Sequence, residues 1–236
     1  MEARIREKGL IFNSEMVRAI LDGRKTQTRR IMKLQPKPSK SRPGDFWFSS
    51  KKLESMVHVS DLAPGNSPIA DYHLFIQEHC CPFGAVGNRI WVREAFRVHS
   101  RATDVATLVY KASERNSWTE QTHRVPVAVC NKPATPEKWT PSLHMPRWAS
   151  RILLEITDVR VERLNAISEE DARAEGIIDG GCLNCGEPEP CGCANPEPDA
   201  TDAFAYLWQS IYGQENWNAN PWVWVISFER VEGGAA

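Results

Sequence analysis

The sequence has no long apolar run and no excess of charge of either sign. Its 236 residues carry a formal net charge of -1. No stretch approaches the roughly 18 apolar residues of a membrane-spanning helix, and the charged N-terminal segment has no signal-peptide core. A chain with balanced charge binds nucleic acid only through a local basic patch. Because the sequence has no apolar span and no signal-peptide core, we expect a soluble, cytoplasmic protein. Its length predicts a single domain over residues 1–236.

Cysteine is sparse outside one short segment. Four of the seven cysteines fall within twelve residues, namely Cys182, Cys185, Cys191 and Cys193. An odd total does not fit a secreted disulfide framework, whereas four thiolates can close around one tetrahedral zinc. We expect a structural zinc, because four cysteines leave no open position for a reacting water. Exposed or reactive thiols and a disulfide pair are the alternatives.

A basic cluster occupies residues 23–30, with the sequence Gly-Arg-Lys-Thr-Gln-Thr-Arg-Arg. It follows a predicted amphipathic helix that Ser14 caps and that runs to Asp22. Such a cluster can hold a phosphate or another ionised ligand, so ligand contacts are expected from Arg24, Thr26, Arg29 and Arg30. The alternative is a solvated helix end whose cations complement the helix dipole. That alternative accounts for one or two cations but not for the hydroxyls.

Alternating apolar residues predict a strand over residues 90–98, with Glu94 on its apolar face. A buried carboxylate needs a cation, and an arginine of residues 24–30 is a candidate partner. We therefore favour an ion pair for Glu94 over a catalytic role, with ligand binding as a further possibility. A second strand is predicted over residues 152–164, with a bulge or tight bend near Thr157 and Asp158 where the apolar phase changes.

Several further elements have clear signals. A capping serine, acids in the first turn and a following glycine predict a helix at residues 168–176. Another helix is expected at residues 203–212. A strand that is covered on both faces is expected at residues 222–228. Insertions are expected at about 35–86, which begins with a proline-rich linker, and at 179–202, which is rich in Gly, Pro and acids. This order favours an α+β fold with a mixed barrel over a doubly wound sheet.

An irregular segment at residues 139–148 contains two tryptophans and two prolines together with His144 and Arg147. These side chains can form the rim of a pocket in which His144 and Arg147 contact a base or a phosphate. Packing of the loop against the rest of the protein is the alternative.

Taken together, the motifs resemble the ASCH domain family, which has a PUA-like β-barrel. The resemblance rests on Gly-Arg-Lys-Thr-x-Thr-x-Arg after the first helix, a Gly-x-x-Ile-Trp-Val-Arg-Glu strand, an Ile-Ser-Glu-Glu-Asp-Ala helix and a closing Trp-Val-Trp-Val-Ile-Ser-Phe strand, which span about residues 9–231. The chain is most similar to phage- and prophage-borne members. The resemblance implies an α+β, ASCH/PUA-like mixed β-barrel with short flanking helices and the Cys-rich insertion.

The resemblance also implies a function. PUA-like domains are similar to RNA-binding modules or readers of modified bases, so the leading expectation is binding of RNA, another nucleic acid or a modified nucleoside. One bacterial ASCH group hydrolyses N4-acetylcytidine with a lysine, a threonine and a glutamate, which correspond to Lys25, Thr28 and Glu175. The alternative is therefore a metal-independent amidohydrolase without an organic cofactor. A phage structural or assembly protein is the second alternative.

Two arrangements distinguish these functions. In a hydrolase, Lys25, Thr28 and Glu175 should converge within hydrogen-bond distance in a closed pocket. In a reader, the basic cluster should open onto a groove long enough for several nucleotides. For Glu175 the competing interpretation is an exposed helix carboxylate.

Overall fold

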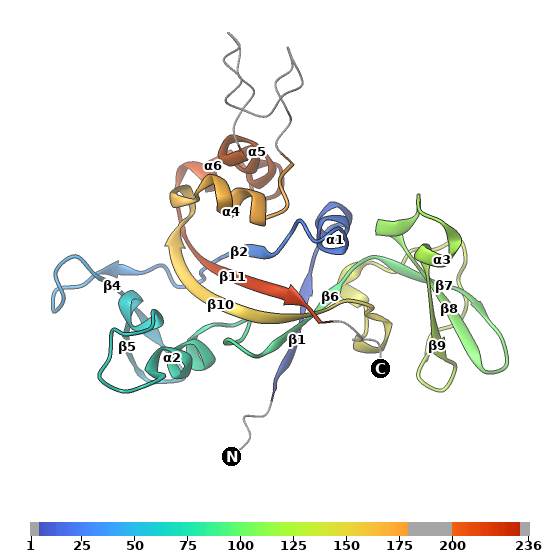
Figure 1. Cartoon of the computed structure of the whole chain (residues 1–236), viewed down its shortest axis with the longest axis horizontal. Helices are drawn as coiled ribbons and strands as arrows, with labels where there is room; N and C mark the ends of the chain where they lie inside the picture. Colours follow the sequence, from blue (N-terminus) through green and yellow to red (C-terminus); the bar gives the residue numbers. More distant parts are fainter. Residues whose placement is uncertain (1–4, 179–199, 232–236) are drawn as a thin grey trace, which may run out of the picture. The chain divides into compact units, whose positions relative to one another are not determined.

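Residues 5–178 and 200–231 are described by the computed structural model, which is mixed α+β with several sheets and short helices (Figure 1). This confirms the predicted fold class at that level. The chain divides into two compact units. Unit 1 comprises Met1–Gly23, Gly87–Ile156 and Glu229–Ala236, and unit 2 comprises Arg24–Val86 and Thr157–Phe228.

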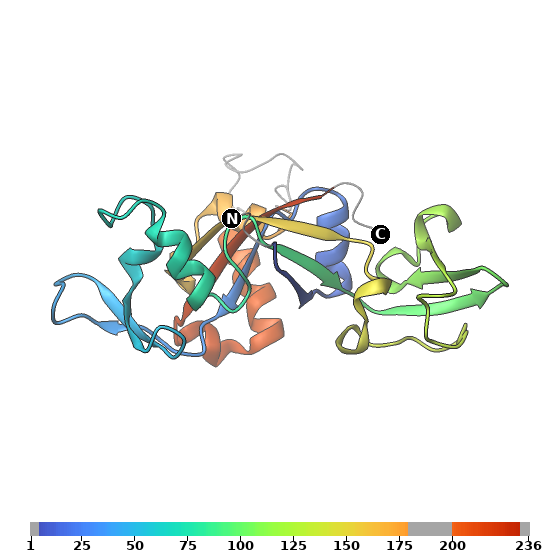
Figure 2. The same ribbon diagram turned by 90° about the horizontal axis from the view of Figure 1, so that it is seen from below.

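Unit 1 contains two groups of paired strands. The first has β1 (Glu7–Ile11) parallel to β6 (Arg89–Arg93), which in turn is antiparallel to the start of β10 (Leu153–Arg163). The second is an antiparallel sheet of β7 (Phe96–Arg101), β8 (Val105–Tyr110) and β9 (Thr122–Pro126). Figure 2 shows this sheet, in green, from a second direction. The unit also contains the α-helices α1 (Ser14–Leu21) and α3 (Trp118–Gln121).

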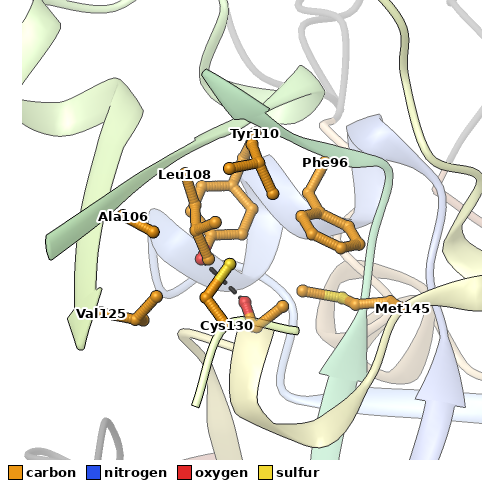
Figure 3. Close-up of a cluster of buried hydrophobic side chains, with 9 residues drawn as sticks. Phe96, Ala106, Leu108, Tyr110, Val125, Cys130 and Met145 are labelled. Atoms are coloured by element: carbon orange, nitrogen blue, oxygen red, sulfur yellow. Dashed lines mark hydrogen bonds between the residues drawn. The ribbon is translucent and has the colours of Figure 1, made fainter. Parts of the chain in front are cut away.

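The β7–β9 sheet has its own apolar core (Figure 3). Alternate residues of each strand point to the same face, which brings Phe96, Leu108, Tyr110 and Val125 together. The Tyr110 hydroxyl donates a hydrogen bond to the Ala149 carbonyl at 2.7 Å, so the one polar atom of that ring is satisfied.

In unit 2, β2 (Gln27–Ile31) is antiparallel to β11 (Trp222–Arg230), and β3 (Lys37–Pro38), β4 (Phe46–Ser50) and β5 (Ser55–His58) form a small antiparallel sheet. The α-helices among the described residues of this unit are α2 (Tyr72–Cys80), α4 (Glu169–Ala174), α5 (Ala200–Tyr212) and α6 (Gln214–Asn218). Helices α4, α5 and α6 lie together in Figure 1. Their apolar core includes Phe204 and Trp208 of α5 and Val223 and Val225 of β11. Because β11 is buried on both faces, its apolar residues occupy both phases, as predicted.

The strand order of the largest sheet is β1-β6-β10-β11-β2. This order has two ends, at β1 and at β2, and no closed barrel is found among the described strands. Strands β10 and β11 each begin in one unit and end in the other. Along β10 the buried positions change phase between Ile156 and Val159, where the sequence predicted the change, although the strand is continuous.

The strand predicted over residues 90–98 is two strands. Strand β6 ends at Arg93 and β7 begins at Phe96, while the buried positions alternate across the break. The reason is a change of hydrogen-bond partner: β6 pairs with β1 and β10, whereas β7 pairs with β8. The alternation of apolar residues shows which face of a strand is buried, but it does not show which other strand pairs with it.

The helix ends also differ in detail. The N-cap of α1 is Asn13, whose Oδ1 accepts from the Met16 amide at 2.8 Å, so the prediction that Ser14 is the cap was wrong by one residue. Helix α4 matches its prediction, with Ser168 as the cap. The region expected as an insertion at 35–86 carries β3, β4, β5 and α2. Within the described ranges, no helix has the length and apolarity needed to cross a membrane.

Candidate functional site

The site begins where the chain enters β2 and where α4 ends. Lys25 and Glu175 face each other in an isolated antiparallel bridge, and the Thr26 amide donates to the Ala174 carbonyl at 2.8 Å. Glu175 is the C-cap of α4, and Gly176 has φ 92°, a conformation that lets the chain turn away directly after the helix. The backbone therefore holds the Lys25 and Glu175 side chains within reach of each other.

Lys25 and Glu175 form a buried ion pair. The Lys25 Nζ donates to Glu175 Oε2 at 2.5 Å and to the Glu175 carbonyl oxygen at 2.8 Å. The two side chains are 0% and 4% exposed. The pKa of Lys25 is lowered, chiefly because burial penalises the charged amine; Glu175 opposes this shift, and the positive charges of Arg30 and Arg29 add to it. Lys25 therefore gives up a proton more readily than an ordinary lysine.

The second carboxylate oxygen of Glu175 has a different environment. Oε1 is buried, and within the described ranges it accepts no hydrogen bond. Arg29 Nη1 lies 3.6 Å from Oε1, beyond hydrogen-bond distance. Leaving a buried acceptor unsatisfied costs on the order of 1–3 kcal/mol, so such atoms need an explanation. Glu175 is 5% exposed, and its interpretation as an exposed helix carboxylate is wrong.

Arg29 links this pair to a wider polar network. Its Nη2 donates to Asp171 Oδ2 at 2.8 Å and to Glu162 Oε2 at 3.3 Å, and its Nη1 donates to Gln27 Oε1 at 2.5 Å. The Arg29 side chain is 0% exposed. The charges of Lys25 and Arg29 are therefore already compensated by carboxylates, which a phosphate would have to displace.

Arg160 binds the same two carboxylates that pair with Arg29, those of Asp171 and Glu162. Its Nη2 donates to Asp171 Oδ2 at 2.7 Å and its Nε to Glu162 Oε1 at 2.5 Å. Burial opposes ionisation of Asp171, but hydrogen bonds from Gln27 and Arg160 keep its pKa below the ordinary value. Asp171 thus stays ionised, and its negative charge fixes the position of Arg29.

Thr28 is buried but is not joined to the ion pair. It lies on β2 opposite Ile226 and is 2% exposed. Its position alternates with those of Gln27 and Arg29, which places its side chain on the other face of the strand. In the described part of the chain, its hydroxyl makes no hydrogen bond to Lys25 or Glu175. Lys25 and Glu175 are thus in contact, but Thr28 does not converge with them, so the arrangement predicted for a hydrolase is only partly found among the described residues.

The other predicted ligand residues of the cluster differ in exposure. Thr26 is exposed, whereas Arg24 and Arg30 are half-buried. Arg24 Nη1 donates to the Gly176 carbonyl at 3.0 Å, and Arg30 Nη1 donates to the Tyr212 hydroxyl at 3.4 Å. Arg24 therefore ties the start of the cluster to the same turn that carries Glu175.

Glu94 lies in unit 1 and has a structural partner. It is 1% exposed, and Arg151 donates hydrogen bonds to it from Nε to Oε1 at 2.9 Å and from Nη2 to Oε2 at 3.1 Å. The prediction of a buried, paired carboxylate is confirmed, but the suggestion that the partner belongs to residues 24–30 was wrong. Periodicity identified the burial; it contains no information on which distant arginine folds against it.

Residues 139–148 contribute to a cavity in unit 1. His144 is exposed and lines a cavity of about 310 Å³ with Trp139, Lys132 and Lys138. Arg147 donates from Nε to Glu7 Oε2 at 2.8 Å. His144 thus remains available to a ligand, whereas Arg147 is engaged in an ion pair.

The predicted zinc ligands Cys182, Cys185, Cys191 and Cys193 lie outside the described residues. Within residues 5–178 and 200–231, no three His, Cys, Asp or Glu side chains gather to hold a metal ion.

The members of the network around Arg29 were not predicted from the sequence, namely Gln27, Asp171, Glu162 and Arg160. A signal was present for two of them: Arg160 and Glu162 share the polar face of β10, where opposite charges two residues apart can pair. Asp171 was assigned only to the first turn of its helix, because nothing local to it points to Arg29.

Comparison with known proteins gave no match: no family model matches the sequence, and no curated protein and no solved structure matches the chain.

Proposed function

We propose that the protein is a metal-independent amidohydrolase with an ASCH-type, PUA-like fold, which removes an acyl group from the exocyclic nitrogen of a base such as N4-acetylcytidine. The observation that carries the proposal is the buried Lys25–Glu175 pair, with Nζ 2.5 Å from Oε2 and with Oε1 left without a hydrogen bond in the described part of the chain. The pair also falls on the two positions that the family resemblance assigns to catalysis.

The arrangement suits hydrolysis of an amide. Glu175 Oε1 takes a proton from a water, whose oxygen then forms a bond to the acyl carbon. The Lys25 ammonium stabilises the developing oxyanion and gives a proton to the leaving nitrogen as the C–N bond breaks. The carboxyl proton of Glu175 then passes to the neutral Lys25 amine beside it, and the products are a carboxylic acid and the free base.

We give Thr28 no part in the reaction, because its side chain lies on the face of β2 opposite to Gln27 and Arg29. A threonine nucleophile needs a base within hydrogen-bond distance, and the Thr28 hydroxyl bonds to neither Lys25 nor Glu175 in the described residues.

The pairing of Lys25 and Arg29 with carboxylates favours hydrolysis of a small amide over binding of a nucleic-acid strand. A groove that follows a phosphate backbone requires cations whose charge is not already neutralised. Lys25 pairs with Glu175, and Arg29 pairs with Asp171 and Glu162. A small, uncharged acylated base does not need to displace these carboxylates.

The test is incubation of the purified protein with N4-acetylcytidine, followed by chromatography for cytidine. We expect turnover by the unaltered protein and a rate at least about 100-fold lower in Glu175→Gln, because a general base contributes about 10² to 10⁴ in rate. Lys40→Ala is the matched control, since Lys40 is an exposed lysine of the same unit, and it should retain full activity.

Loss of activity through misfolding has to be separated from loss of chemistry. The variant Lys25→Met with Glu175→Leu removes both charges together and leaves neither partner unpaired. It should keep the circular dichroism spectrum of the unaltered protein and show no turnover. The proposal would be overturned if the unaltered protein showed no turnover, or if Glu175→Gln kept the turnover of the unaltered protein. Salt-dependent retention of single-stranded RNA would then support the alternative, RNA binding.

A further inference from the structure

Unit 2 contains a cavity of about 470 Å³ that is separate from the Lys25–Glu175 pair. Neither residue of that pair lines it, and nor does Thr28. The volume lies within the range of about 300–1,000 Å³ that is typical of small-molecule sites. Most of its wall is apolar and is formed by Ile31, Met32, Phe48, Pro82, Phe83 and Trp224.

Two aromatic rings give the wall a fixed shape. Phe48 of β4 and Trp224 of β11 are 6% and 3% exposed. Their ring centroids are 6.1 Å apart with an interplanar angle of 85°, an edge-to-face contact. Both rings are anchored on strands, so the apolar surface is present before any ligand arrives.

The charges around this cavity have one sign. Lys33, Lys51 and Lys52 line it and are exposed, His79 joins them, and none of the lining residues is an aspartate or glutamate. In the described part of the chain, none of the three lysines forms an ion pair with a carboxylate. Three cations that share one rim repel one another, and a bound anion relieves that repulsion.

The positive charge of Lys52 acts on the cavity wall. Burial raises the pKa of the Cys80 thiol, while a hydrogen bond to Ser50 and the positive charge of Lys52 oppose the rise. Lys52 therefore acts electrostatically on a group that lines the cavity.

We propose that this cavity binds an organic anion, a molecule with an apolar aromatic or aliphatic body and a single carboxylate, sulfonate or phosphate group. The body packs against Phe48 and Trp224, and the anionic group lies among Lys33, Lys51 and Lys52. This site goes beyond the proposed hydrolysis and does not depend on it, because the two sets of residues do not overlap.

Two fluorescent probes with the same aromatic body test the proposal. 8-Anilinonaphthalene-1-sulfonate carries a sulfonate, and N-phenyl-1-naphthylamine lacks it. We expect the sulfonate to bind the unaltered protein more tightly than the neutral probe and to lose affinity as salt is added. Decanoate should displace it, whereas decanol should displace it far less well.

The lysines are tested by the triple variant Lys33→Gln, Lys51→Gln, Lys52→Gln. Exposed ion pairs are each worth about threefold in affinity, so the sulfonate should bind about tenfold or more weakly, with the neutral probe unchanged. The matched control changes three other exposed lysines, Lys37, Lys40 and Lys111, to Gln and should alter neither probe. Circular dichroism checks that each variant is folded.

The apolar wall is tested by Ser49→Trp, because Ser49 lines the cavity and is exposed. An indole there fills the space and should weaken both probes. Equal affinity of the sulfonate for the triple variant and its lysine control, or no effect of Ser49→Trp, would overturn the proposal. The variant Lys25→Met with Glu175→Leu should bind both probes normally, so failure of the hydrolase proposal and failure of this one can be told apart.

Discussion

Replacing Arg151 with methionine should destabilise unit 1 strongly. Arg151 makes two hydrogen bonds to Glu94, and the two side chains are 13% and 2% exposed. Methionine retains much of the apolar stem but leaves a buried carboxylate without its cation. Breaking a buried pair in this way costs about 3–5 kcal/mol. Arg151 Cζ also lies 4.0 Å from the Tyr110 ring centroid, and methionine, which has no charge, loses this cation–π contact.

The cost should depend on pH. Burial raises the pKa of Glu94 above its ordinary value, and Arg151 opposes the rise. Without Arg151, the pKa of Glu94 rises further. An acid whose folded pKa lies above its unfolded pKa binds more protons when folded, so stability is lost as pH rises above the unfolded pKa of about 4.3. Arg151→Met should therefore be most destabilised at neutral and higher pH, and partly recover near pH 5.

Urea unfolding at pH 5 and pH 8, followed by circular dichroism, measures both effects. The double variant Glu94→Gln, Arg151→Met removes the charge as well as its partner and should be more stable at pH 8 than Arg151→Met alone. A loss below about 1 kcal/mol at pH 8 is what an exposed pair would give. That result, or a loss of equal size at both pH values, would refute the reasoning.

Three further predictions concern other parts of the chain. If the Lys25 ammonium donates the proton to the leaving nitrogen, kcat/KM for N4-acetylcytidine should fall as pH rises through a pKa below the ordinary 10.5 of lysine, and a profile flat to pH 10.5 would contradict that role. Asn13→Ala should lower the free energy of unfolding by about 1 kcal/mol, and Ser14→Ala by less, because the Asn13 side chain caps α1; urea titration of both variants compares them. The motif Cys182, Cys185, Cys191 and Cys193 predicts about one zinc per chain by elemental analysis, with loss of the metal in Cys182→Ser.

Local signals in the sequence predicted local structure well. Helix α4 was found from Ser168, its first-turn acids and Gly176, all of which act within one or two turns. The buried faces of β6, β7 and β11 followed from periodicity in the same way. The break at Glu94 was missed, because it depends on which strand pairs with which and not on the residues of the strand itself.

The candidate site was predictable only in part for the same reason. Lys25 and Glu175 were placed together by the family resemblance, since 150 residues separate them in sequence. The partners of Arg29 were not predicted, because Asp171 and Glu162 come from two other elements of the fold. Likewise, the cavity beside Phe48 and Trp224 joins β4 to β11 and leaves no pattern within either strand.

The cost of burying charge supports a functional reason for the network in unit 2. Replacing a buried ion pair by apolar residues of similar volume is often neutral or stabilising, so packing alone does not explain why Lys25 and Glu175 are present. Glu175 Oε1 adds a further cost, because it is buried without a hydrogen bond in the described residues. Catalytic sites commonly carry such costs, which substrate binding or the reaction then makes useful. The variant Lys25→Met with Glu175→Leu should therefore unfold at a temperature no lower than the unaltered protein, although it lacks activity. A large loss of stability would mean instead that the pair is retained for the fold.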